Sequence, residues 1–119
     1  MAENAVKDKS KCFALRIIKL YKYLCESKRE FIISKQILRS GTSIGANICE
    51  AEHSMSKKEF IAKMNISLKE SAETEYWLEL LHESEYINDN EFSSIASECN
   101  EIKGLLISII KTANSRIAK

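Results

Sequence analysis

Proline is absent from this 119-residue chain, and only three of its residues are glycine. Proline removes a backbone donor and glycine costs about 1 kcal/mol inside a helix, so a chain poor in both is typical of an almost wholly helical protein. No run approaches the roughly 18 apolar residues that a membrane-spanning helix needs. The N-terminus has no apolar run behind a basic start, so we expect no signal peptide and a cytoplasmic protein.

The sequence also lacks the motifs of common reactive centres. None of its four cysteines forms a C-x-x-C pair, and we expect reduced thiols packed as small apolar residues. Neither of the two histidines is tied by a motif to a serine or cysteine. Glu50–His53 and Glu79–His82 both read Glu-x-x-His, a motif of di-iron bundles, but each lies late in its predicted helix. Because consecutive antiparallel helices would separate them, we expect no enzyme activity, no metal and no cofactor.

Apolar residues recur at spacings of three and four in four segments, which is typical of helices that bury one face. We predict a single domain over residues 1–119 with helices at about 6–25, 28–53, 57–84 and 89–116. Capping boxes precede the last three of them, at Ser27–Glu30, Ser56–Glu59 and Asn88–Glu91. Helices joined by such short turns predict an all-α fold, an up-down-up-down antiparallel four-helix bundle.

Three of the predicted helices have the following buried stripes. In the first, the stripe is Val6, Phe13, Ile17, Leu20 and Leu24, broadened by Leu15 and Tyr21. In the third, it is Ile61, Met64, Leu68, Ala72, Leu78 and Leu81, with an interruption at Glu75. The fourth has the most regular stripe, which consists of Phe92, Ile95, Cys99, Ile102, Leu106, Ile109 and Ala113.

Residues 39–50 (RSGTSIGANICE) carry two glycines and a row of polar residues within the helical period. A helix that keeps two glycines brings another backbone close, since only a missing side chain allows such contact. One interpretation is a core helix crossed by its neighbour. The other is a polar seam buried against another helix or subunit, with Trp77 either an interface anchor or a core residue. The candidate interface residues are Arg39, Gly41, Ser43, Gly45, Asn47, Glu50, Glu75 and Trp77.

Charge is segregated along the chain although the net charge is only +1. Residues 1–39 carry a net +6, residues 40–100 a net −8 and residues 101–119 a net +3. Such complementarity suits a head-to-tail interface that closes into a ring. The basic residues of the first two helices also form a candidate nucleic-acid face, unless they are solvated or meet the acidic third helix of a neighbour. They are Lys19, Lys22, Lys28, Arg29, Lys35 and Arg39.

Three segments, Arg39–Glu50, Ser56–Met64 and Leu68–Leu81, together resemble the bacterial four-helix-bundle family, also called the 23S rRNA intervening-sequence protein family. The resemblance implies a ring-shaped homopentamer without an assigned activity. Relatives include the accessory protein of diversity-generating retroelements, which works with a reverse transcriptase and RNA. The chain departs from the family at Ala51, where glycine is frequent, and its near-neutral charge is unlike that of the strongly basic relatives.

Two functions follow as hypotheses. The first is a non-enzymatic oligomeric scaffold or adapter, most simply a homopentamer. The second is an accessory protein that binds RNA or DNA, or a nucleic-acid enzyme, through the basic face of the first two helices.

Overall fold

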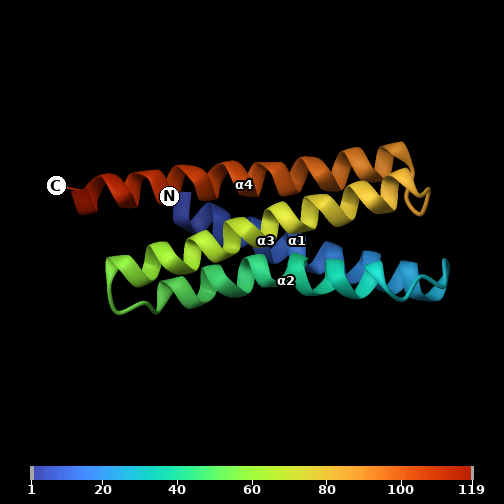
Figure 1. The fold of residues 1–119 in the computed structure, drawn as a ribbon, viewed down its shortest axis with the longest axis horizontal. Coiled ribbons are helices and arrows are strands. Elements are labelled where there is room, and N and C mark those ends of the chain that lie inside the picture. Colours follow the sequence, from blue (N-terminus) through green and yellow to red (C-terminus); the bar gives the residue numbers. More distant parts are fainter. Residues whose placement is uncertain (1, 119) are drawn as a thin grey trace.

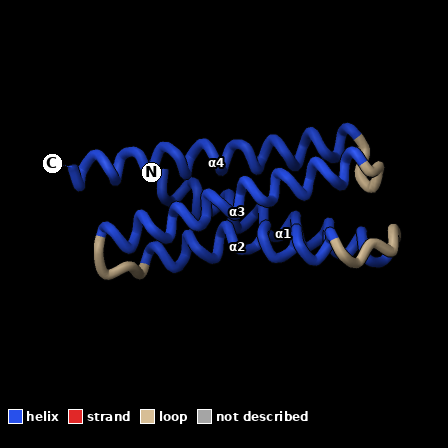
Figure 2. Tube along the Cα trace, in the orientation of Figure 1, coloured by secondary structure: helices blue, strands red, loops and turns tan. Residues whose placement is uncertain are grey.

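The computed structural model describes residues 2–118, which form four α-helices and no strand. The helices are α1 (Ala2–Glu26), α2 (Ile33–Glu52), α3 (Lys57–Glu83) and α4 (Asp89–Ala118). The chain turns back at each of the three loops, drawn tan in Figure 2, and builds an elongated bundle of 51 × 22 × 20 Å (Figure 1). The predicted all-α helical bundle is therefore confirmed. Among these residues no helix has the length and apolarity needed to cross a membrane.

The core runs along the axis of the bundle and takes one stripe from every helix. Helix α1 packs against α2 and α4, and α3 packs against the same two, so α1 and α3 lie diagonally across the bundle. The regular stripe of α4 is buried as predicted, with Phe92 half-buried at its start. The fully buried large side chains are Val6, Phe13, Ile17, Leu24, Ile37, Ile44, Met64, Leu78, Leu81, Ile102 and Leu106.

Two apolar residues assigned to the core from the sequence lie outside it. Leu15 is 56% exposed, and Ala72 is exposed as well. Leu15 stands two residues from Phe13 and from Ile17, which places it about 200° around the helix from each of these buried neighbours. Ala72 follows the buried Ser71, whose carbonyl accepts from Cys99 of α4, and lies about 100° around the helix from it. Both residues therefore add apolar surface to the outside of the bundle.

The loop between α1 and α2 differs from the sequence prediction. Helix α2 begins at Ile33, because the chain after α1 passes through Arg29 in the left-handed region at φ 55°. The predicted Ser27–Glu30 capping box does not form. Instead the buried Glu30 carboxylate accepts backbone N–H bonds from Ile32 (3.2 Å), Ile33 (2.9 Å) and Ser34 (2.7 Å). One carboxylate thus satisfies three of the N–H groups that the first turn of a helix leaves without partners.

The other two helix starts do use their capping residues. Ser56 Oγ accepts from Glu59 N (3.1 Å), while the Glu59 carboxylate reaches back to Met55 N (3.2 Å). Asn88 and Glu91 form a fully reciprocal pair, with bonds of 2.8 and 2.9 Å. These local bonds fix the two turns that reverse the chain.

Both glycines of α2 face α1 within the same chain. A methyl group on Gly41 would lie 2.9 Å from two γ-carbons of Ile17, and one on Gly45 would lie 3.3 Å from Ser10 Oγ. The close approach expected from the glycines is therefore between α1 and α2, and it needs no second subunit. On the other side of α2, the buried Thr74 donates to Ser40 Oγ (2.9 Å), and Ser67 donates to Ile44 O (2.8 Å).

Candidate functional site

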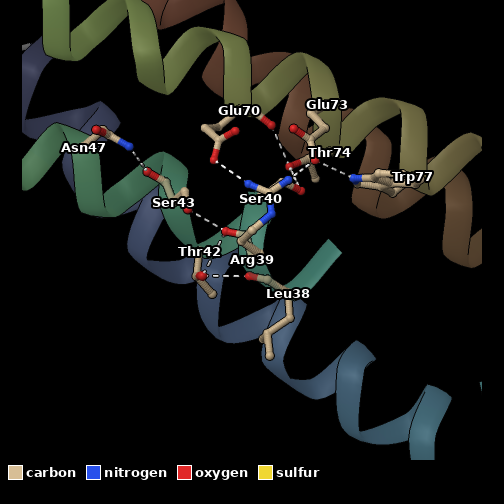
Figure 3. A network of polar contacts seen from close by, with 10 residues as sticks. All are labelled: Leu38, Arg39, Ser40, Thr42, Ser43, Asn47, Glu70, Glu73, Thr74 and Trp77. Atoms are coloured by element: carbon tan, nitrogen blue, oxygen red, sulfur yellow. Dashed lines mark hydrogen bonds and ion pairs between the residues drawn. The ribbon is translucent and has the colours of Figure 1, made fainter. Parts of the chain in front are cut away.

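A polar network joins α2 to α3 along the outside of the bundle (Figure 3). The Arg39 guanidinium donates to the carboxylate of Glu70 (3.1 Å) and to that of Glu73. The same Glu73 oxygen accepts from the Trp77 indole nitrogen at 2.9 Å. Glu70, Glu73 and Trp77 share one side of α3, since they follow one another at spacings of three and four. The network therefore fixes the orientation of Trp77 relative to both helices.

Three more polar residues continue this edge of α2. Ser43 donates to Arg39 O (2.6 Å), and Asn47 donates to Ser43 O (2.8 Å), so both side chains bond within their own helix. Glu50 pairs with Lys63 of α3 at 2.8 Å. The outer contacts between α2 and α3 are thus ion pairs made by Arg39 and by Glu50. Solvent screens the attraction between these charges.

The predicted polar seam does not form one continuous surface. Arg39, Ser43, Asn47, Glu50 and Trp77 do lie along the α2–α3 edge. The two glycines instead face α1, and Glu75 faces α4, where its carboxylate accepts from Lys103 Nζ at 2.9 Å. That hydrogen bond and the charge of the carboxylate raise the pKa of Lys103 above its ordinary value.

Trp77 and Tyr76 point to different sides, as neighbouring residues on a helix must. Trp77 is half-buried and packs against the core, while Tyr76 is 53% exposed. Their rings meet edge to face with centroids 5.2 Å apart. The indole therefore supports the fold, and the phenol ring is exposed aromatic surface that a partner can contact.

All six predicted basic-face residues are exposed, and among the described residues five of them form no ion pair: Lys19, Lys22, Lys28, Arg29 and Lys35. Lys28 lies over the Tyr23 ring at 5.9 Å. The sixth, Arg39, pairs with the carboxylates of Glu70 and Glu73 on α3. The basic face consequently belongs to α1, the loop that follows it and the start of α2.

The two Glu-x-x-His motifs have other partners. Glu50 pairs with Lys63, and His82 bonds Asp89 (2.7 Å) while its ring stacks on Phe92 at 4.2 Å. Between residues 2 and 118, no three side chains of the metal-binding types gather into one group. Burial raises the pKa of the Cys99 thiol to about 12, an effect that the Glu75 carboxylate reinforces and Lys103 opposes. Cys99 therefore stays a thiol at neutral pH, which makes it a poor nucleophile.

Sequence reasoning missed the exposed apolar surface and the partners of Arg39. In the sequence, Glu70 and Glu73 were recognised only as acidic residues of the third helix. Their spacings from Trp77 place all three side chains on one face of that helix. Ile66, which is 42% exposed on α3, was not singled out. A helical wheel that scored apolar residues on the polar side of each helix would have found Leu15, Ile66 and Tyr76.

Comparison with known proteins gives a family and a solved structure with a similar fold. The family model described as 23S rRNA-intervening sequence protein matches residues 2–108. The chain is 60% identical to a Bacteroides thetaiotaomicron protein of unknown function from the S23 ribosomal protein family, whose crystal structure it matches with a TM-score of 0.93. That match covers 93% of this chain and 99% of the other. No curated protein matches the chain.

Proposed function

The chain belongs to the 23S rRNA-intervening sequence protein family, as its three motifs predicted, and from this premise we propose that it is a non-enzymatic scaffold or adapter. Its working form is a ring-shaped homopentamer in the cytoplasm. The bundle offers a partner two kinds of surface, apolar side chains in mid-helix and charges of opposite sign on different helices. Neither a phosphate-binding loop nor a nucleophile paired with a base stands out among the described residues.

The observation that carries this proposal is the apolar surface in the middle of exposed helix faces. Leu15, Ile66, Tyr76 and Ile107 are each more than two-fifths exposed and lie well away from the helix ends. Single exposed apolar residues are common on monomers. Here two of the four share α3, whose outward face also carries Ala72 and Ala62. A helix with apolar residues on both faces is typical of one that is covered on both sides.

Light scattering on a size-exclusion column tests the assembly. We expect one species whose mass is a multiple of the 13.6 kDa chain at micromolar concentration. A species of 13.6 kDa that persists as the concentration rises would contradict the scaffold. The expected multiple is five.

A second function, RNA or DNA binding by an accessory protein, is favoured by the five exposed basic residues of α1, its loop and the start of α2. Binding by neutralised phosphates would weaken steeply with salt, with a slope close to the number of contacts. We expect a Lys28→Glu, Arg29→Glu variant to lower both the affinity for single-stranded RNA and the salt slope. No affinity of the unchanged protein for RNA or duplex DNA at low salt would rule this function out.

A further inference from the structure

A groove opens at the end of the bundle where α1 begins and α4 ends. Figure 1 shows that α1 begins short of the α2–α3 turn and of the C-terminal end of α4. Among the described residues, the last turns of the bundle at this end are therefore built by α2, α3 and α4. The space beside them has a volume of about 1100 Å³, at the upper end of the size of small-molecule sites.

The floor of this groove is the end of the hydrophobic core. One large apolar side chain from each helix lines it, and each of the four is less than a tenth exposed: Val6, Ile48, Met64 and Ile109. Two small residues, Ala51 and Ala113, and the half-buried ring of Phe60 line it as well. An apolar chain that lies in the groove can therefore pack against the core from its open end.

The rim carries an excess of positive charge. Among the charged side chains that line the groove, Glu52 is paired with Lys7 at 3.1 Å. Lys57 and Arg116 form no ion pair within residues 2–118, and neither does Glu3, which is the opposing charge. With histidine neutral, two unpaired positive groups and one unpaired negative group leave a net charge of +1. A ligand group with a single negative charge therefore balances the rim.

Hydroxyl groups lie along the same rim. Ser108 and Thr112 are one turn apart on α4, and Arg116 follows one turn later, so the three share the side that lines the groove. Elsewhere in the chain, helical hydroxyls such as those of Thr42 and Ser71 donate to a carbonyl of the preceding turn. Within the described residues, Ser108 and Thr112 make no such bond. Both hydroxyls can therefore donate to a polar head group.

The α2–α3 turn adds two further features to the lining. The Oγ atom of Ser54 is buried and has no hydrogen-bond partner inside the described part of the chain. A buried hydroxyl without a partner is costly, so a polar group bound beside it gains more than at an exposed serine. Helix α3 begins at Lys57, directly after this turn, and the N-terminal end of a helix attracts negative charge. The turn therefore favours the same kind of head group as the rim.

We propose that this groove binds a carboxylate with a single aliphatic chain, one molecule per protein chain. The methylene groups lie on the apolar floor, and the carboxylate meets the charges of Lys57 and Arg116. A carboxylate fits the charge balance because it carries one negative charge, whereas a phosphate monoester carries nearly two at pH 7. This inference goes beyond the proposed scaffold, since it depends neither on the assembly nor on a nucleic acid.

Calorimetric titration of the full chain at pH 7 with three probes tests the proposal. Decanoate has both the chain and the charge, decanol lacks the charge, and acetate lacks the chain. We expect decanoate to bind with one molecule per chain, about tenfold more tightly than decanol, and acetate not to bind. The heat capacity change for decanoate should be negative, because apolar surface is buried.

Thr112→Trp locates the site. An indole on this wall fills the groove, so we expect the variant to lose decanoate binding. Asn114→Trp is the matched control, because Asn114 is exposed on the same helix but does not line the groove, and this variant should bind as the unchanged protein does. Since Thr112 is exposed as well, circular dichroism should show the same helicity for both variants.

Substitutions of the charged residues test the head group. The double variant Lys57→Gln, Arg116→Gln is expected to weaken decanoate binding by about tenfold and to leave decanol binding unchanged. Glu3→Gln removes the opposing charge and should tighten decanoate binding by about twofold, again without an effect on decanol.

Absence of decanoate binding to the unchanged protein would overturn the proposal. It would equally be overturned by a Thr112→Trp variant that binds as tightly as the unchanged protein, or by decanol binding as tightly as decanoate. A double glutamine variant that keeps the full affinity for decanoate would also contradict it. None of these results bears on the mass of the protein, so the scaffold stands or falls separately by light scattering.

Discussion

Gly41→Leu is expected to destabilise the fold by about 3 kcal/mol, near the upper end of what overpacking a core costs. The first added carbon alone would lie 2.9 Å from Cγ1 and Cγ2 of Ile17, which is closer than carbon atoms pack. Those two atoms branch at Cβ next to the backbone of α1, so a rotation of the Ile17 side chain cannot clear the space. Helices α1 and α2 must therefore move apart. Urea unfolding of the variant at a fixed protein concentration measures the loss.

Gly104→Leu is the control for this experiment. Gly104 lies inside α4 with no atom within 4 Å of an added methyl group. Removing a helical glycine there is expected to stabilise the protein by about 0.5–1 kcal/mol. The same substitution thus has opposite signs at two helical glycines. Equal effects at both positions would show that the close approach of α1 and α2 does not exist.

Glu30→Ala is expected to cost about 2–3 kcal/mol, because it leaves three backbone N–H groups at the start of α2 without their acceptor. Glu30→Gln keeps one acceptor oxygen and should cost about half as much. Ser56→Ala removes a single capping bond at the start of α3 and should cost about 1 kcal/mol. Chemical denaturation at pH 7 ranks the three variants. A Glu30→Ala variant no less stable than Ser56→Ala would contradict the role of the carboxylate.

The same carboxylate makes part of the stability depend on pH. Burial alone raises the pKa of Glu30, but the bonds from the N–H groups of Ile33, Ser34 and Ile32 outweigh it and hold the pKa below its ordinary value. A lowered folded pKa gives stability that is complete above the unfolded pKa, about 4.3, and is lost as the pH falls through the folded value. The stability difference between wild type and Glu30→Gln should therefore shrink between about pH 5 and pH 3. A constant difference would contradict this linkage.

Much of the architecture could be predicted because helical periodicity is a property of local sequence. The alternation by three and four in α4 survives intact in the structure. The predicted start of α2 was wrong, for a reason that the local sequence pattern does not reveal. Ser27–Glu30 has the residues of a capping box, but Arg29 adopts a left-handed conformation, and the Glu30 side chain caps a helix that begins at Ile33.

The surfaces were harder to predict than the core. A glycine in a helix indicates a close neighbour without saying which helix supplies it, and here α1 accounts for both Gly41 and Gly45. Leu15 was assigned to the buried stripe because it is apolar, although the position that it occupies on α1 faces outward. Arg39 was grouped with the basic residues of the first two helices, since sequence alone does not show the carboxylates that α3 places beside it.

The assembly remains a prediction, and native mass spectrometry of the unmodified protein tests it most directly. The account predicts a dominant species of five times the 13.6 kDa chain, with single chains appearing when the Leu15→Glu substitution is introduced. A spectrum that contains single chains alone, at concentrations of tens of micromolar and low salt, would contradict it.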